Sequence, residues 1–241
     1  MLKKTKTMVL QQRNINSNTS FINFKGNMIQ NVSEYNSLGS LIKSNGNLNH
    51  SLEDLAKKAQ KVLFSIKSRV ASLGNIPIKV SNNLFDKLVQ PVLTYNAEIS
   101  FMDSYLTYYR AKRRAEISNK EIDNFTFIDK TPCERIDLIF CKFTLGAKKI
   151  SSNIGVRAEL GRLPMEHFIM TQSILYLSLL HSDNVNPLLK EALILSKSLD
   201  SQGTYSWFTF VKNITLDQNI FDKTSNCKYL KEVKSLKPFI I

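Results

Sequence analysis

The sequence predicts an α+β fold that is mostly α, with a small N-terminal antiparallel β-hairpin region followed by a helical bundle. Three observations predict it. Short runs of β-forming residues between turn signals are confined to positions 1–47. Apolar residues recur at helical spacing from position 48 onward. Strong helix-start pairs, such as Thr131-Pro132 and Asn186-Pro187, divide the remainder into separate helices.

The N-terminal region predicts short strands that pair as hairpins. Lys25-Gly26-Asn27 is a turn signal between two runs of β-formers, and Gly39 lies inside the last run. A cluster of turn-forming residues at 44–47 ends the region. The predicted strands are 7–10, 21–24, 28–32 and 35–42.

Helix boundaries are predicted from capping residues and prolines. Ser51 is expected to cap a first amphipathic helix that ends before Gly74. A second helix is expected over 77–109, kinked or split by Pro91, which removes a backbone donor. Thr131 and Glu134 have the spacing of a capping box. The charged segment 110–130 is expected to be a loop or an exposed helix end, and further helices are expected over 151–161, 165–180, 187–199 and 206–214.

Length and composition limit the classes of protein. A chain of 241 residues can form one or two domains, and the pattern divides it into zones 1–47, 48–146 and 147–241. Lys and Arg number 33 against 20 Asp and Glu, a formal charge of +13 that favours a polyanionic partner over a merely basic surface. The basic N-terminus lacks the apolar run of a signal peptide, and the longest apolar stretch, 168–180, is too short for a membrane span, so we expect an intracellular, non-secreted protein without membrane contact.

No catalytic or metal site is predicted from the residues. Cys133, Cys141 and Cys227 lack the spacing of metal ligands, and the three histidines are far apart in sequence. Chemistry with two metal ions requires converging carboxylates, and the only adjacent acidic pair is Glu53-Asp54 in the expected first helix. A capping role explains that pair, so no residue is predicted to be catalytic.

The order of several short motifs is similar to the reverse transcriptases of LINE-type (non-LTR) retrotransposons. In the first 46 residues the motifs are Lys4-Thr5-Lys6-Thr7-Met8-Val9-Leu10, Phe21-Ile22-Asn23-Phe24-Lys25-Gly26-Asn27 and Glu34-Tyr35-Asn36-Ser37-Leu38-Gly39. Beyond residue 48 they are 73–80, 85–95, Glu98, 140–142, Leu145-Gly146 and 152–164. Each motif alone is weak, but their order and spacing together cover most of the chain. The chain differs from the family pattern at Leu10, at Ser37 and at Ile99-Ser100-Phe101, where the family usually has aromatic residues.

The resemblance implies a carboxy-terminal piece of an RNA-directed DNA polymerase. It places the segment with Lys4 and Lys6 just after the catalytic aspartates, where one lysine lies near the incoming nucleotide, and it makes Tyr35, Leu38 and Gly39 part of a hairpin that grips the primer. Residues 48–146 would be thumb-like. The aspartate pair is expected outside this polypeptide, so the chain alone should be inactive, with Mg²⁺ expected only in the full-length polymerase.

A thumb must hold a duplex without reading its sequence, which requires Lys and Arg on helix faces. One candidate set is Lys57, Lys58 and Lys61 on the first helix; a second is Arg110, Lys112, Arg113 and Arg114; a third is Lys142, Lys148, Lys149, Arg157 and Arg162. A solvated face is the alternative for each set. Tyr105, Tyr108 and Tyr109 flank the second set, where they either stack on bases or pack in the core.

The expected partners are RNA, DNA or an RNA–DNA hybrid, in the nucleus or the cytoplasm. The alternative is an inactive retroelement relic, or a co-opted helical interaction module without enzymatic activity.

Overall fold

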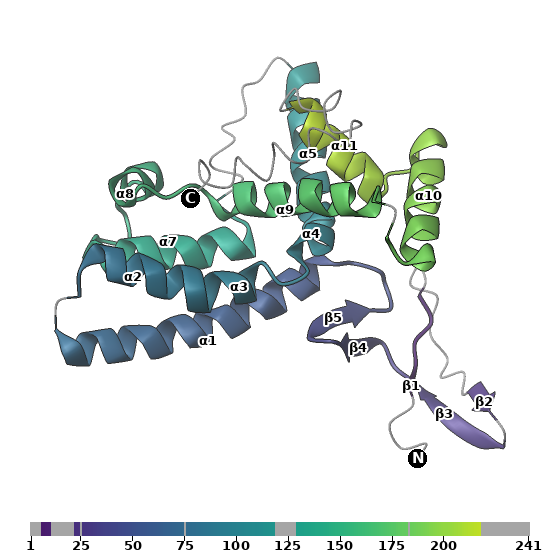
Figure 1. Cartoon of the computed structure of the whole chain (residues 1–241), viewed down its shortest axis with the longest axis horizontal. Helices are drawn as coiled ribbons and strands as arrows, with labels where there is room; N and C mark the ends of the chain where they lie inside the picture. Colours follow the sequence, from purple (N-terminus) through teal and green to yellow (C-terminus); the bar gives the residue numbers. More distant parts are fainter. Residues whose placement is uncertain are drawn as a thin grey trace. The chain divides into compact units, whose positions relative to one another are not determined.

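The computed structural model describes residues 6–10, 22–24, 26–74, 76–118, 129–182 and 184–217. It confirms an α+β fold that is mostly α, with the strands near the N-terminus and helices after them (Figure 1). The chain forms two compact units, Met1–Asn96 and Ala97–Ile241. The boundary at Asn96 therefore lies inside the predicted middle zone 48–146, because the first helices pack with the strands.

A small three-stranded sheet and a separate hairpin make up the β structure of the first unit. In the sheet, β3 lies between β1, which is parallel to it, and β2, which is antiparallel. Gly26 has a φ of +78° in the predicted turn between β2 and β3. The strands are β1 Lys6–Thr7, β2 Ile22–Phe24, β3 Asn27–Asn31, β4 Glu34–Ser37 and β5 Ser40–Lys43.

The β4–β5 hairpin corrects one strand prediction. Segment 35–42 was predicted as a single strand, whereas it is two antiparallel strands joined at Leu38 and Gly39. Both turn residues have positive φ, +49° and +90°. Positive φ at both central residues is typical of the two-residue turns that match the twist of a hairpin. The glycine accommodates this conformation easily, and the leucine does not.

Helix α1, Asn49–Leu73, forms the core of the first unit. It presents Leu52, Leu55, Ala59 and Leu63 to the interior, where they are fully or almost fully buried, and it packs on β5 and α3. The predicted cap at Ser51 is wrong, because the helix begins two residues earlier and Ser51 is buried within its first turn. Gly74 ends the helix with a φ of +82°, as predicted.

The predicted second helix is divided into several segments. A π-helical turn, η2 Phe85–Val89, precedes Pro91, which lacks the backbone donor that a regular helix uses. The segments are α2 Ile78–Leu84, η2, α3 Gln90–Leu93, α4 Ala97–Ser100 and α5 Met102–Ile117. Phe85, Val89 and Leu93 are buried, and η2 and α3 both pack against α1.

Helix α5 answers the question left open for segment 110–130. The basic residues of the second candidate set lie in its C-terminal half, which is an exposed helix end. Residues 119–128 of the segment lie outside the described residues.

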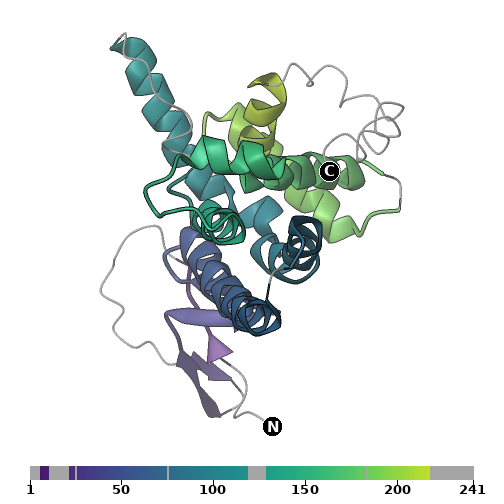
Figure 2. The same cartoon turned by 90° about the vertical axis from the view of Figure 1, so that its left-hand side faces the viewer.

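The second unit is built around α9, Met165–Leu180, whose Met165 and Ile169 are completely buried. Helices α4, α7, α10 and α11 pack on it (Figure 2). The predicted helix starts at Thr131 and Asn186 are confirmed, and of Ser151 and Ser152, which both could begin the next helix, Ser152 is the cap; each of these side chains accepts a backbone N–H hydrogen bond at its helix start. The other helices are α7 Pro132–Thr144, α8 Asn153–Leu160, α10 Pro187–Ser201 and α11 Trp207–Asp217.

Hydrogen bonds and aromatic contacts connect α4 and α5 to this centre. The Trp207 indole N–H donates to the Glu98 carbonyl oxygen over 2.8 Å, and the Ser173 hydroxyl donates to the same oxygen over 3.2 Å. Tyr105 packs edge-on against Phe210, with ring centroids 5.1 Å apart. These contacts fix the base of α5, and Arg110, Arg113 and Arg114 in its C-terminal half are exposed.

Candidate nucleic-acid interface

The N-terminal candidate lysines are described only in part. Lys6 is exposed on β1, beside Gln30 of β3. Lys4 lies outside the described residues, so the structure does not distinguish which of the two corresponds to the lysine that the family resemblance implies. An exposed Lys6 is compatible with contact to a phosphate.

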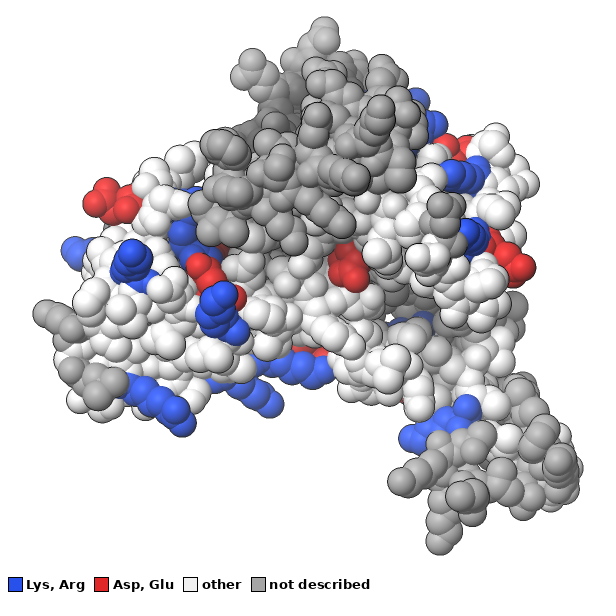
Figure 3. Space-filling model, in the orientation of Figure 1, with Lys and Arg blue, Asp and Glu red and all other residues white. Residues whose placement is uncertain are grey.

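The candidate lysines of α1 have two different environments. Lys57 and Lys61 are exposed one turn apart, on the side of α1 away from its buried leucines. Figure 3 shows basic atoms along this margin of the helix. The ammonium group of Lys58 is engaged by two partners within the protein. It lies 2.6 Å from Asp54 and donates to the Gly39 carbonyl oxygen over 3.0 Å. Lys57 and Lys61 therefore remain candidates for phosphate contact, whereas Lys58 mainly supports the hairpin.

Helix α5 carries the densest exposed basic face. Arg110, Arg113 and Arg114 are exposed and recur at i, i+3 and i+4, which places them on one side of the helix. We call these three residues the α5 arginine face. Lys112 is only half-exposed and lies on a different side. Three guanidinium groups on one helix face match the requirement for neutralising neighbouring phosphates.

The tyrosines beside this face pack mostly inside the protein. Tyr105 is 2% exposed, and its ring contacts Phe210 and Tyr108. It therefore cannot stack on bases, which decides in favour of core packing at that position. Tyr108 and Tyr109 are half-buried.

The third candidate set is divided by the fold. Lys148 and Lys149 are exposed in the connection between α7 and α8, where the Lys142 ammonium donates to the Lys149 carbonyl oxygen over 2.7 Å. This connection and α5 lie on different sides of the second unit (Figure 1). The two lysines therefore form a second basic patch within the unit.

Arg157 is a correction to the predicted set. Its side chain is 4% exposed, and its guanidinium donates to Asp129 over 2.7 Å and to Glu134 over 2.8 Å. The third carboxylate, that of Asp137, lies 3.6 Å from its Nε. A guanidinium buried among three carboxylates does not reach a phosphate, so Arg157 is removed from the set of candidate contacts.

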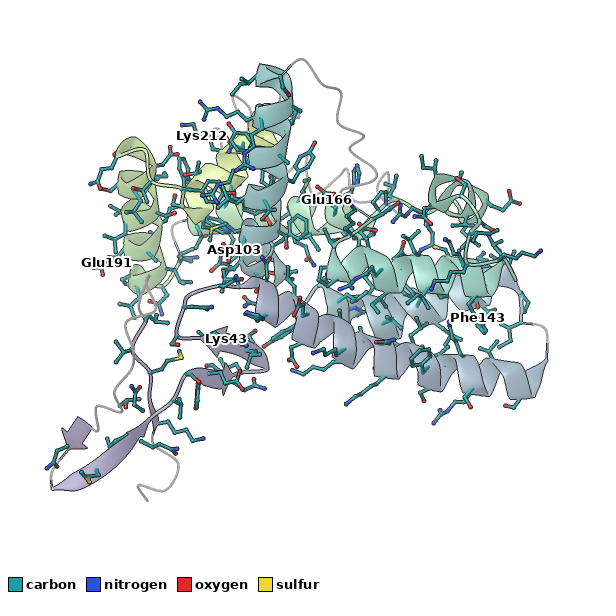
Figure 4. The ribbon with its side chains drawn as sticks, turned by 180° about the vertical axis from the view of Figure 1, so that it is seen from behind. Lys43, Asp103, Phe143, Glu166, Glu191 and Lys212 are labelled. Atoms are coloured by element: carbon teal, nitrogen blue, oxygen red, sulfur yellow. The ribbon has the colours of Figure 1, made fainter. Side chains whose placement is uncertain are left out.

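Arg157 belongs to a buried ionic cluster that joins α7, α8 and α9. The Glu166 backbone N–H, at the start of α9, donates to Glu134 over 2.7 Å. Figure 4 labels Glu166 on this helix. Arg162 donates from Nε to Asp137 over 3.2 Å, with its guanidinium over the Phe140 ring. Glu134 therefore serves as a bridge between helices, and the predicted capping box is limited to the Thr131 side chain.

Carboxyl groups outnumber guanidinium groups in this buried cluster, and the pKa values of three of these carboxyl groups are raised. Burial and the neighbouring Asp137 raise the pKa of Glu134 to about 8, against the opposing effect of Arg157. Burial raises the pKa of Glu166 to about 7 and also raises the pKa of Asp137. Burial disfavours the charged form of Arg157, but Glu134 and Asp129 outweigh it, and the pKa of the guanidinium is raised. The folded unit therefore retains protons that an unfolded chain releases.

We expect the stability of the second unit to decrease as pH rises from about 5 to about 8. A carboxyl whose pKa is higher in the folded state binds more protons there, so its stabilising contribution is complete below its ordinary pKa near 4.5 and is lost through the raised values near 7 and 8. The loss should be on the order of 6 kcal/mol, roughly 3.5 from Glu134 and roughly 2.5 from Glu166, measured by urea unfolding across this range. His167, whose pKa is lowered by burial and then by Arg157, acts in the opposite direction at the acidic end.

The matched variants are Glu166→Gln and Glu159→Gln. Glutamine at 166 keeps the neutral side chain at all pH values, so the profile should flatten and the variant should gain stability at pH 8 relative to the unsubstituted chain. Glu159 is exposed on α8, and its replacement should leave the profile unchanged. A profile that rises with pH in this range would contradict the assignment.

The primer-grip candidates lie on the β4–β5 hairpin. Tyr35 is in β4 with a partly exposed ring, and Leu38 and Gly39 form the turn. The Leu38 side chain is 90% exposed. Its carbonyl oxygen accepts a hydrogen bond from the Tyr95 hydroxyl over 2.6 Å. The structure thus brings Leu38 and Gly39 together at the tip of a supported turn, and the supporting Tyr95 was not predicted as part of it.

The described residues do not include a metal-binding group of three or more His, Cys, Asp or Glu side chains. The one adjacent acidic pair in the sequence is used structurally, with Asp54 paired to Lys58 and Glu53 3.8 Å from His50. Within the same described residues, no helix is both long and apolar enough to cross a lipid bilayer.

The sequence did not predict the residues that hold other residues in place through distant hydrogen bonds and ion pairs, namely Tyr95 and Arg157. The motif that contains Tyr95 and the motif that contains Arg157 were both singled out by the family resemblance, but neither residue had a local signal for its partner. The partner of Tyr95 is 57 positions away, and those of Arg157 are 23 and 28 positions away.

Comparison with known proteins gives no assignment: no protein-family model matches the chain, and neither the curated proteins nor the solved structures include a significant match.

Proposed function

We propose that this chain binds the sugar-phosphate backbone of RNA, DNA or an RNA–DNA hybrid, as the thumb-like part of a reverse-transcriptase-like polymerase, and that it does not polymerise by itself. The α5 arginine face carries the proposal. Its three arginines, at i, i+3 and i+4, are exposed and form no ion pair with a carboxylate of the described residues, in contrast to Arg157 and Arg162. The first unit adds Lys57 and Lys61 on α1.

This set of residues favours backbone contact over base readout. Arginine and lysine side chains on an exposed helix face reach phosphate oxygens without entering a groove. The net charge of +13 adds a sequence-independent attraction. An A-form hybrid, with its deep and narrow major groove, is recognised through shape and backbone in the same manner.

The test is the salt dependence of binding to a hybrid duplex. If the α5 arginine face and the two α1 lysines each neutralise one phosphate, log K should decrease with log salt with a slope of about −4 to −5. Fluorescence anisotropy with a labelled duplex between 50 and 300 mM salt measures the slope. Binding that is absent, or that does not change with salt, would refute the proposal.

The absence of polymerase activity has a separate assay. Primer extension on an RNA template with Mg²⁺ should give no product with this chain, because its sequence has no Asp-Asp pair of the kind that carries two-metal chemistry in the family that the motifs resemble. Primer extension by this chain, but not by a mock preparation that controls for contaminating polymerase, would refute the expected lack of polymerase activity. It would leave the proposed nucleic-acid binding untouched.

A second candidate function is a helical interaction module, and α10 favours it. This helix exposes Leu188, Ile194 and Leu195, each more than 60% accessible, and Leu199 in addition. Exposed apolar patches of this kind mark interaction surfaces. Self-association measured by light scattering over a range of concentrations, and abolished by Leu195→Glu, would support this function; a monomer at all concentrations would count against self-association.

A further inference from the structure

Helix α10 has a row of exposed apolar side chains along one side. They recur at intervals of four, three and four positions, which is the spacing of the apolar seam in a two-stranded coiled coil. All of them are exposed, in contrast to Leu193 of the same helix, which is buried in the second unit. We call this set the α10 stripe; it consists of Leu188, Ala192, Leu195 and Leu199.

Other sides of α10 have their partners within the second unit. The Ser196 hydroxyl accepts a hydrogen bond from the Phe208 backbone N–H over 2.9 Å, and Asp200 pairs with the Lys212 ammonium at 3.0 Å. Together with the buried Leu193, these contacts attach α10 to α9 and α11. The helix is therefore fixed on the unit while the described residues leave the stripe exposed.

The stripe is complementary to itself when two copies of α10 lie antiparallel. Read from 188 to 199, its side chains are large, small, large and large. In the antiparallel arrangement Ala192 lies opposite Leu195 of the second copy, and Leu188 lies opposite Leu199. Each small side chain then faces a large one, which is how facing helices fill the space between them. In a parallel arrangement Ala192 would face Ala192 and leave a gap.

The charges of α10 do not oppose this pairing. The helix has two lysines, one glutamate and one aspartate, which cancel, whereas the whole chain carries +13 and two copies repel each other. By helical spacing, the charged residue nearest the stripe is Glu191, which Figure 4 labels on α10. In the antiparallel arrangement Glu191 lies beside Ser198 of the second copy. No like charges therefore meet along the contact.

We propose that α10 pairs with α10 of a second copy of this chain, antiparallel and about a twofold axis, with Ala192 opposite Leu195. A twofold contact uses the same surface on both copies, so the assembly closes at a dimer. Four side chains per copy are far fewer than the roughly 20 to 30 residues that each partner of a standard interface contributes, so the dimer is weak and reversible. This inference rests on the second candidate function, whose partner and geometry it names, and is independent of nucleic-acid binding.

Two adjacent residues supply a matched pair of variants. Leu195 and Ile194 are 66% and 65% exposed, but one residue advances by about 100° around a helix, so only Leu195 belongs to the stripe. The unsubstituted chain should dimerise with a Kd on the order of 100 μM in sedimentation equilibrium. Leu195→Glu places an unpaired charge in the contact and should raise this Kd at least about tenfold. Ile194→Glu should change it by less than about threefold, and both variants should keep the melting temperature.

Disulfide trapping tests the orientation of the two helices. The single-cysteine variants Ala192→Cys and Leu195→Cys, each combined with Cys227→Ser, are mixed and oxidised. Cys133 and Cys141 are buried and should not react. A disulfide requires β-carbons within about 4.5 Å of each other. Antiparallel pairing should therefore give mainly the mixed disulfide between positions 192 and 195, and parallel pairing the two like disulfides.

Each outcome decides one part of the proposal. A monomer throughout the concentration series, or an equal effect of Leu195→Glu and Ile194→Glu, would overturn pairing through the stripe. The second candidate function would then need a different occupant of α10, such as a helix of another protein. A majority of like disulfides would overturn the antiparallel orientation. None of these results affects the proposed nucleic-acid binding, which duplex titrations test separately.

Discussion

Replacement of Arg157 by alanine should lower the free energy of unfolding of the second unit by about 3–5 kcal/mol. The guanidinium is 4% exposed and pairs with Asp129 and Glu134, with Asp137 3.6 Å away. Removing it leaves buried carboxyls without their cation, and loss of one partner of a buried pair is far more costly than loss of a surface pair. It also releases the tie between α7 and α8.

Urea unfolding followed by circular dichroism gives the value, with two controls. Arg113→Ala removes an exposed arginine of the same charge and should change stability by no more than about 0.5 kcal/mol. Arg157→Lys retains the charge but not the forked geometry, so it should recover only part of the loss. An Arg157→Ala variant as stable as Arg113→Ala would show that the buried cluster does not stabilise the unit.

Replacement of the whole α5 arginine face by alanine should weaken nucleic-acid binding by about 100-fold or more at 0.1 M salt. Each phosphate contact contributes roughly 0.9 to the slope of log K against log salt, so the loss of three should make the slope less steep by about 2 to 3. Since the three side chains are exposed, the melting temperature should change little. Anisotropy titrations at several salt concentrations measure both quantities.

The matched control removes three charges from elsewhere. Lys79, Lys87 and Arg135 are exposed and lie outside the proposed interface, so the triple alanine variant has the same net charge as the α5 variant. If both variants lost the same affinity and the same slope, the effect would be one of overall charge, and α5 would have no special role.

Local signals in the sequence predicted much of the fold. Thr131, Ser152 and Asn186 act as helix caps because a cap depends only on a side chain and the next few backbone groups. Gly74 and Gly161 end their helices with positive φ for an equally local reason. The basic side chains of α5 were predicted as a charged exposed segment, which is what the helix end provides.

Features that depend on distant partners were not predictable in the same manner. No local sequence signal distinguishes Arg157 from Arg113. Arg157 is buried because α8 packs against α7, whereas Arg113 is exposed. Glu134 has the spacing of a capping box, yet its carboxylate binds Arg157 and the start of α9. The strand predicted over 35–42 became a hairpin because the turn is stabilised by Tyr95 and Lys58, far along the chain.

The π-helical turn at Phe85–Val89 affects which residues of the neighbouring helices α2 and α3 are buried. In a regular α-helix, residues four apart drift around the axis by about 40° at each step, because 3.6 residues complete a turn. Ser81, Phe85, Val89 and Leu93 follow this spacing and are nevertheless all buried. A wider turn rotates less per residue and cancels the drift. The irregularity therefore keeps the buried residues of α2, η2 and α3 on one face, and η2 and α3 both pack against α1 on either side of the proline.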